Sequence, residues 1–232
     1  MIFVTATDTG VGKTHFSRLI LDEAAEFYDR SEIAYFKPVQ AGKDTKELYG
    51  NVFYETDYQC IERSCHDVDT YCTYFVETPA SPDYSARKDG VEIKISEIVK
   101  HFNELKSQYK FIVVEGAGGL MVPINDNELI SDIALALNIP AVLITKPVLG
   151  TINQTLLSCE HAKNKGLDLK ALIMAESIKD RDCIQTDFEG LDIEGEQLEA
   201  SIDSIERFSG FKFNSVAGGV TEFREKLSLV SS

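Results

Sequence analysis

The chain has 232 residues, with 38 Asp or Glu against 23 Lys or Arg, and a formal net charge of −15. This length suits one sizeable hydrophobic core and no linker divides it, so we expect a single domain over residues 1–232. The negative charge argues against nucleic acid or an anionic membrane as partner. The chain has neither the signature of a signal peptide nor an apolar run of about 18 residues, so we expect a soluble, cytoplasmic protein.

Apolar runs alternate with segments of helical period along the chain. Residues 2–6 (IFVTA) predict a buried strand, and residues 13–28 predict a helix with an apolar stripe of Phe16, Leu19, Ile20, Ala24 and Phe27. In chain order, the further expected elements are a strand at 33–39, a helix at 95–108, a strand at 111–119, a helix at 130–138, a strand at 141–146, a helix at 151–165 and a strand at 169–175. The pattern predicts an α/β fold, with a parallel sheet and helices on both of its faces.

Two segments interrupt this alternation. Residues 41–90 are rich in Tyr, Pro and Ser and read as loops and short helices inserted over the end of the sheet. Ligands of open parallel sheets bind at the carboxyl ends of the strands, so this insertion can shape a pocket. The acidic stretch 176–206 is the second interruption.

Residues 4–15 (VTATDTGVGKTH) end like a phosphate-binding loop and lie between an expected strand and helix, as in P-loop NTPases. Backbone N–H groups, Lys13 and the Thr14 hydroxyl would face phosphate and Mg²⁺. The standard spacing needs a glycine at position 7, where this chain has Thr7, so the strict pattern fails. An ordinary strand-to-helix turn is the alternative.

Three charged residues strengthen the phosphate-binding hypothesis. Glu115 ends an apolar strand, where a carboxylate can bind the magnesium of a nucleotide. Lys37 also ends a strand and could neutralise a transferring phosphoryl group, although a single strand-end lysine is usually solvated. Asp57 offers a third oxygen ligand, or alternatively caps a helix.

Five cysteines, an odd number, make a disulfide framework improbable, so we expect reduced thiols. Cys60, Cys65, His66 and Cys72 cluster in the sequence but lack the close pairs of common zinc sites. Buried or incidental thiols are the favoured interpretation, with a zinc site as the alternative.

The segments TATDTGVGKT, KPVQAG, TDYQ, SP at 81–82, VEGAGGLMVPI and LGTINQ follow the order and approximate spacing found in the dethiobiotin synthetase family, which the chain resembles over about residues 1–175. In that family the loop has five residues before its Gly-Lys-Thr, and its usual leading glycine is Ala6 here. Alanine lacks glycine's freedom at positive φ.

The resemblance implies an enzyme, a ligase of biotin synthesis that uses ATP and Mg²⁺. In the family, 7,8-diaminononanoate takes up CO₂ as a carbamate, the γ-phosphoryl group of ATP activates it, and the second amine closes the ureido ring. Such chemistry depends mainly on positioning and charge stabilisation.

The resemblance also implies roles for individual residues. The implied catalytic residues are Lys37, Lys13 and Thr9. The implied nucleotide-binding residues are Asp8, Thr9, Gly10, Val11, Gly12, Lys13, Thr14, Glu115, Gly118 and Glu176, and the implied magnesium ligands are Thr14, Asp57 and Glu115. The implied substrate-binding residues are Lys37, Ala41, Ser81, Pro82, Gly150, Thr151, Ile152 and Asn153.

Members of the family are homodimers with the diamine at the subunit interface, so a homodimer with small-molecule substrates is expected here. The start of the helix expected at 151–165 would bind the substrate carboxylate through its N–H groups. Asn153 can instead be an ordinary first-turn polar residue.

Two positions depart from the family pattern. Ala41 stands where many members have serine, which removes one hydroxyl. Glu176 stands where the family reads adenine with asparagine, and an ionised carboxylate accepts hydrogen bonds but cannot donate one. Either base selectivity is relaxed or Glu176 points to solvent and other groups hold the base.

Other protein classes share such a loop. The main alternative is a partitioning or division-site ATPase. Those proteins carry a lysine where this chain has Asp8. Amidotransferases of cobalamin synthesis need a further glutaminase domain, and a non-catalytic nucleotide-binding module is the remaining alternative.

Overall fold

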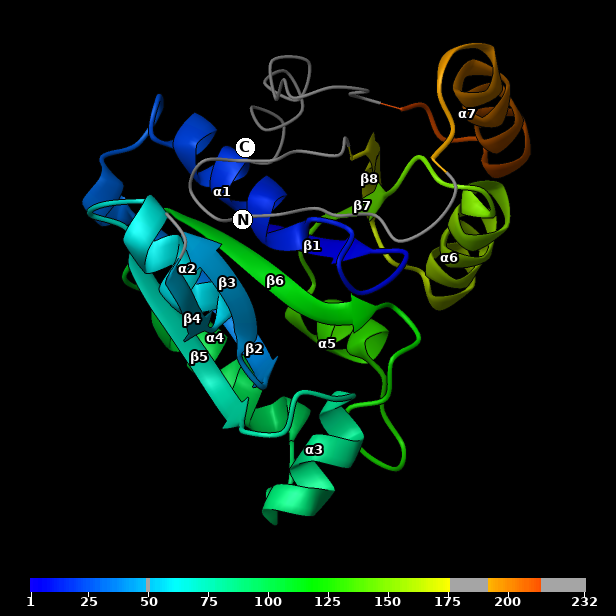
Figure 1. The fold of residues 1–232 in the computed structure, drawn as a ribbon. Coiled ribbons are helices and arrows are strands. Elements are labelled where there is room, and N and C mark those ends of the chain that lie inside the picture. The colour runs from blue at the N-terminus through cyan, green and yellow to red at the C-terminus, as the bar shows by residue number, and fades with distance from the viewer. Residues whose placement is uncertain (49–50, 176–191, 214–232) are drawn as a thin grey trace.

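The computed structural model describes residues 1–48, 51–175 and 192–213. Its centre is a sheet of six parallel strands in the order β5-β2-β6-β1-β7-β8 (Figure 1). The strands are β1 (Ile2–Ala6), β2 (Ile33–Ala41), β5 (Asp69–Val76), β6 (Phe111–Gly119), β7 (Ala141–Thr145) and β8 (Leu169–Met174). Two further strands, β3 (Asp44–Leu48) and β4 (Asn51–Glu55), pair antiparallel apart from this sheet.

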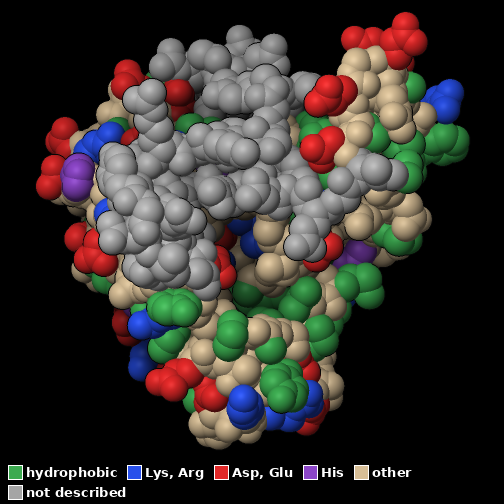
Figure 2. Space-filling model, viewed as in Figure 1, with side chains coloured by type: hydrophobic (Ala, Val, Ile, Leu, Met, Phe, Trp, Pro, Cys, Tyr) green, Lys and Arg blue, Asp and Glu red, His purple; other side chains and the backbone are tan. Residues whose placement is uncertain are grey.

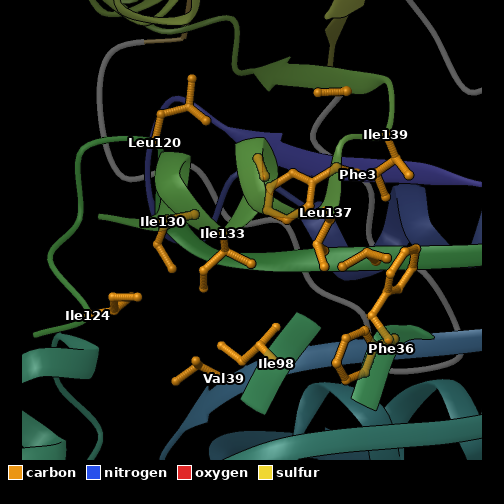
Figure 3. Close-up of a cluster of buried hydrophobic side chains, with 14 of the residues drawn as sticks. Phe3, Phe36, Val39, Ile98, Leu120, Ile124, Ile130, Ile133, Leu137 and Ile139 are labelled. Atoms are coloured by element: carbon orange, nitrogen blue, oxygen red, sulfur yellow. The ribbon is translucent and has the colours of Figure 1, made fainter. Parts of the chain in front are cut away.

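Helices cover both faces of the sheet. They are α1 (Lys13–Ala24), α2 (Asp57–Ser64), α3 (Pro82–Asp89), α4 (Ile95–Lys106), α5 (Ile130–Leu137) and α6 (Thr151–Lys165), while α7 (Gly195–Ser209) packs against α6 and a 3₁₀ turn η1 lies at Arg30–Glu32. The core under α1 and α2 holds Val4, Phe16 and Ile61. The core on the opposite face receives α4 and α5 and includes Phe36 and Ile98 (Figure 3). Alternate residues of a strand enter opposite cores, which is why the central strands are apolar throughout.

The structure confirms the α/β fold and each expected strand and helix to within a few residues. Two details of the sequence-based expectation are wrong. Helix α1 ends at Ala24, so Phe27 lies beyond it and is 59% exposed instead of completing the apolar stripe. Residues 41–90, expected to form loops and short helices, also contain strands. Residues 69–76 form edge strand β5, whose partly exposed side chains make no continuous apolar run, and β3 and β4 form the separate antiparallel pair.

The strand order reverses direction beside β1. The chain passes from β1 to β2 on one side, whereas β7 and β8 continue on the other side of β1. In such sheets a crevice opens at the carboxyl ends of the strands beside the reversal, here those of β1 and β6. No helix in the described part of the chain is long and apolar enough to cross a membrane.

Candidate active site

The loop from β1 to α1 has the backbone of a phosphate-binding turn. Gly10 and Gly12 have φ of +72° and +99°, and Gly12 directly precedes the first residue of α1. A side chain would strain both positions. Lys13 Nζ bends back over the loop and donates to the carbonyl oxygen of Asp8 at 3.0 Å. The loop thereby presents helix N–H groups and one ammonium at the end of the sheet, a suitable arrangement for an anion.

Ala6, where the resemblance leads us to expect a glycine, lies at the end of β1 with 0% exposure. The only non-glycine residues of positive φ in the described segments are Asp67 and Asn138, so Ala6 needs no glycine-like conformation. The residue that must be small here is Gly119 on the neighbouring strand β6, because a Cβ on Gly119 would lie 3.2 Å from the carbonyl oxygen of Ala6. The alanine is therefore compatible with the loop.

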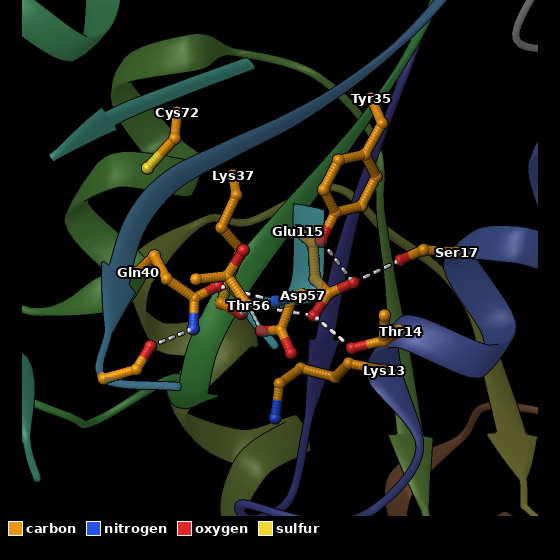
Figure 4. Close-up of polar contacts among 12 residues, drawn as sticks. Lys13, Thr14, Ser17, Tyr35, Lys37, Gln40, Thr56, Asp57, Cys72 and Glu115 are labelled. Carbon is orange, nitrogen blue, oxygen red and sulfur yellow. Dashed lines mark hydrogen bonds and ion pairs between the residues drawn. The ribbon is translucent and has the colours of Figure 1, made fainter. Parts of the chain in front are cut away.

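Lys37 lies between two carboxylates that come from different elements. Its Nζ is 2.6 Å from Oδ2 of Asp57 and 2.8 Å from Oε1 of Glu115, and it donates to the carbonyl oxygen of Gly116 at 3.0 Å (Figure 4). The side chains of Lys37 and Glu115 are 3% and 0% exposed. Burial alone would lower the pKa of Lys37, but Asp57 and Glu115 outweigh it and raise that pKa above its ordinary value. Lys37 is therefore a permanent cation here.

The two oxygens of Glu115 have separate sets of partners. Oε1 accepts from Lys37 and from the Thr14 hydroxyl at 3.1 Å, whereas Oε2 accepts from Ser17 Oγ at 2.8 Å and from the Tyr35 hydroxyl at 2.9 Å. Burial, and then the charge of Glu115, raise the pKa of Tyr35, which stays a donor. Sequence reasoning missed Ser17 and Tyr35. The spacing in the sequence could have indicated both residues. Ser17 follows Thr14 by about one helical turn, and Tyr35 lies two residues before Lys37, on the same face of the strand.

Helix α2 begins with a capping box that does not use Asp57. The Thr56 hydroxyl accepts from Gln59 N, and Gln59 Oε1 accepts from Thr56 N. Asp57 is the first helical residue, so the alternative that it caps a helix is wrong. The Asp57 carboxylate is left to pair with Lys37.

Lys13, Lys37, Asp57 and Glu115 border a cavity of about 490 Å³. Figure 2 shows a hollow in the middle of the viewed face, with hydrophobic side chains below it. Of the residues singled out from the sequence, the lining includes Thr9, Gly10, Gly12, Lys13, Thr14, Lys37, Ala41, Asp57, Ser81, Pro82, Glu115 and Gly118. The lining also includes Cys60, singled out above for its thiol. The lining residues that sequence reasoning missed are His15, Gln40, Asp44, Pro79, Ala80, Ala117 and Val122.

The other candidate residues lie elsewhere. Val11 is buried in the core under α1, and the Asp8 side chain accepts from Thr9 N. Residues 150–153 form the start of α6 and are not part of the cavity lining. Glu176 lies outside the described residues.

The cysteine cluster does not assemble into a metal site. Burial raises the pKa values of Cys65 and Cys72 to about 11, which keeps both thiols protonated. Within the described ranges, no three His, Cys, Asp or Glu side chains are grouped to hold a metal ion.

Magnesium requires a smaller set of protein ligands, because it is commonly held by one or two carboxylates together with the phosphates of a nucleotide. The Glu115 and Asp57 carboxylates both contact Lys37 Nζ, and the Thr14 hydroxyl is bonded to Glu115. These are hard oxygen donors beside the anion-binding loop. The residues present therefore fit magnesium bound with a nucleotide.

Lys13 differs electrostatically from Lys37. Burial first, and then the positive charge of Lys37, lower the pKa of Lys13 to about 8. An anion in the loop would favour the charged form of this lysine.

Comparison with known proteins found one matching family model and relatives that share one name. A family model described as an AAA domain matches residues 1–221. An ATP-dependent dethiobiotin synthetase of Anoxybacillus flavithermus is 36% identical over 182 residues, covering 74% of this chain and 76% of that protein. One of Methanocaldococcus jannaschii is 35% identical over 178 residues, covering 75% and 78%.

Solved structures with a similar fold include a ParA family ATPase and a MinD cell division protein. A ParA family ATPase of Chlorobium tepidum matches with a TM-score of 0.53 at 11% identity, covering 99% of this chain and 88% of that one. The MinD cell division protein of Aquifex aeolicus matches with a TM-score of 0.52 at 13% identity, covering 97% and 85%. At such identities the likeness shows the fold alone.

Proposed function

Because the chain belongs to the dethiobiotin synthetase family, we propose that it is a ligase that uses ATP and CO₂ to form dethiobiotin from 7,8-diaminononanoate. The observation that carries the proposal is the buried cluster in which Lys37, held by Asp57 and Glu115, borders the same cavity as the phosphate-binding loop. A buried cation beside an anion-binding loop suits the transfer of a phosphoryl group between two negatively charged partners.

The chemistry needs three bond-forming steps. One amine of the substrate attacks CO₂ and loses a proton to give a carbamate, whose oxygen then attacks the γ-phosphorus of ATP while ADP leaves. The second amine then attacks the carbamate carbon, inorganic phosphate leaves and a proton is released. No residue becomes covalently attached, so the protein acts by positioning and by charge.

We assign roles to the residues at the cavity. The N–H groups of the Gly10–Gly12 turn and Lys13 bind the phosphates of ATP, and Thr9 donates to the carbamate. Lys37 stabilises the negative charge that passes from the carbamate to the phosphoryl group. Magnesium, when bound, supplies further charge neutralisation, and Thr14, Asp57 and Glu115 would hold it.

One wall of the cavity has a role in substrate binding. Ala41, Ser81 and Pro82 border the cavity there, and we assign them to the diamine. Pro82 begins α3 directly after Ser81, which gives that wall a fixed backbone direction.

We also propose a homodimer in which the start of α6 from a second copy binds the carboxylate of the diamine. Large apolar side chains are exposed at and near this helix, Leu149 by 64%, Leu157 by 62% and Ile152 by 36%. A second copy would cover them. Sedimentation of the wild type and of Ile152→Glu tests this assembly. We expect the wild type to sediment as a dimer and the variant, with a charge in the interface, to sediment as a monomer.

The base of the nucleotide is a separate part of the proposal. Glu176 accepts from amino groups but cannot donate as asparagine does, so the preference for ATP over GTP and CTP should be weak. Rates with the three nucleotides test this assignment. A strong ATP preference that survives Glu176→Asn would refute it.

The reaction itself is tested by product analysis. Purified protein is given Mg-ATP, bicarbonate and 7,8-diaminononanoate, and the ureido product is identified by mass spectrometry. Dethiobiotin formed only in the complete mixture supports the proposal. ATP hydrolysis that proceeds equally well without the diamine would instead favour a partitioning-type ATPase.

A further inference from the structure

Gln40 lies three residues after Lys37 on β2 and is only 5% exposed. Both polar ends of its side chain are bonded within the protein. Its Oε1 accepts from the backbone N–H of Asp57 at 3.1 Å, and its Nε2 donates to the carbonyl oxygen of Gly42 at 3.1 Å (Figure 4). A buried amide used in this way connects parts of the structure.

The bond to Asp57 is separate from the cap of α2. Thr56 and Gln59 complete the capping box by themselves. The Gln40 bond instead ties the first turn of α2 to β2, the strand that carries Lys37. The residue that is tied is also the one whose carboxylate lies 2.6 Å from Lys37 Nζ.

The other end of the amide reaches a second wall of the cavity. Gly42 N donates to Val76 O at 2.7 Å, and a Cβ on Gly42 would lie 2.5 Å from Pro79. The backbone at Gly42 is thus packed directly against Pro79, which lines the cavity. Gln40 therefore links the Asp57 side of the cavity to the Pro79 side.

We propose that Gln40 is a positioning residue that fixes the Asp57 carboxylate relative to Lys37 and Glu115, and so sets the spacing of the oxygens that hold magnesium. The magnesium part rests on the proposed function. Groups that orient a metal ligand commonly change metal affinity by about 10- to 100-fold when they are removed. The relevant effect is thus on metal binding before any chemistry occurs.

The test compares two glutamines that both accept a hydrogen bond from the backbone at the start of α2, Gln40 from Asp57 N and Gln59 from Thr56 N. Gln40→Met removes the tie to β2, whereas Gln59→Met removes one bond of the capping box, and each exchange nearly preserves side-chain size. The dissociation constant of Mn²⁺ in the presence of ATP is measured by electron paramagnetic resonance. We expect it to rise about tenfold in Gln40→Met and to stay within about twofold of wild type in Gln59→Met.

Kinetics give a second readout. Gln40→Met should need about tenfold more Mg²⁺ for half-maximal rate, and its KM for the diamine should change by a smaller factor than this Mg²⁺ requirement. Wild-type Mn²⁺ affinity in Gln40→Met, or an equal loss in Gln59→Met, would overturn the proposal. A wild-type protein that binds Mn²⁺ with ATP but forms no dethiobiotin would refute the proposed reaction, and the comparison of the two variants would still decide the role of Gln40.

Gln40→Glu keeps the test decisive if the methionine variant fails to fold. It retains an acceptor for Asp57 N, loses the donor to Gly42 and adds a carboxylate, whose negative charge would not by itself weaken the binding of a cation. We expect Mn²⁺ binding within about threefold of wild type. A folded Gln40→Glu protein with tenfold weaker binding would contradict the proposed role of the Asp57 bond.

Discussion

Lys37 Nζ and Asp57 Oδ2 form a 2.6 Å salt bridge with side-chain exposures of 3% and 19%. Glu115 contacts the same ammonium at 2.8 Å with 0% exposure, so two carboxylates share one cation. Such a group carries a net negative charge where water is largely excluded. It is therefore suited to accept a further cation together with a nucleotide.

Replacing Lys37 with methionine should destabilise the fold and abolish activity. Asp57 and Glu115 would then face each other without a cation, a loss of about 3–5 kcal/mol for breaking a buried ion pair. Mg²⁺ should raise the melting temperature of Lys37→Met more than that of wild type, because the metal takes the vacant position. Lys43→Met, at an exposed lysine beyond the end of β2, is the control. Equal magnesium responses in the two variants would contradict this account.

Removing the Tyr35 hydroxyl should lower stability by about 1–3 kcal/mol, because Glu115 Oε2 loses one of its two donors inside the protein. Tyr35→Phe changes nothing else in that core. The control is Tyr71→Phe, which leaves the Tyr109 to Asp69 hydrogen bond intact. Urea unfolding of both variants checks the prediction, which fails if Tyr71→Phe is destabilised as much as Tyr35→Phe.

Much of this site could be predicted from the sequence for a simple physical reason. The carboxyl ends of parallel strands meet at one edge of the sheet, so Lys37 and Glu115, each following an apolar run, were expected there with the loop at Lys13. Asp57 was a candidate ligand with helix capping as the alternative, and the sequence alone left this choice open because the position of Asp57 depends on how α2 packs.

What escaped prediction depends on contacts between distant segments. Gln40 is an unremarkable strand residue until α2 is placed so that Asp57 N reaches its amide oxygen. Strand β5 was missed because it lies at the edge of the sheet, where its partly exposed side chains give no continuous apolar run in the sequence. Register and helix docking, not local periodicity, decide both.

The low pKa of Lys13 predicts an unusual effect of pH on stability. Burial and Lys37 lower that pKa from 10.5 to about 8, so the unfolded chain binds more protons than the folded one between these values. This group therefore makes the fold more stable as pH rises from about 8 to 10.5, and least stable below about 8. Nucleotide binding should show the opposite trend, because phosphates need the charged lysine.

Lys13→Met measures that effect. The lowered pKa corresponds to roughly 3 kcal/mol at pH 7, and the lost bond to Asp8 O offsets about 1 kcal/mol of it. We expect the variant to unfold at higher urea than wild type at pH 7, with the difference shrinking toward pH 10, and to lose ATP binding. A variant less stable than wild type at pH 7 would show that the buried lysine is not strained.

Gly42→Ala should disturb the substrate wall more than an ordinary glycine exchange. Gly42 has φ of +71°, and an added Cβ would lie 2.5 Å from Pro79, so backbone must move. Gly166→Ala is matched in conformation, with φ of +75° and open space around it, and should cost about 1–2 kcal/mol. Gly42→Ala should lose at least about 2 kcal/mol more and raise the KM for the diamine, because Ser81 and Pro82 follow Pro79. Similar melting temperatures for the two variants would exclude the close packing.

The central claim is that one cavity couples ATP cleavage to ring closure on a diamine. The most direct measurement is the ratio of phosphate released to dethiobiotin formed, in single turnovers with Mg-ATP and bicarbonate, with and without 7,8-diaminononanoate. We expect a ratio near one with the diamine and negligible phosphate release without it. Phosphate released at the same rate in its absence would contradict the claim.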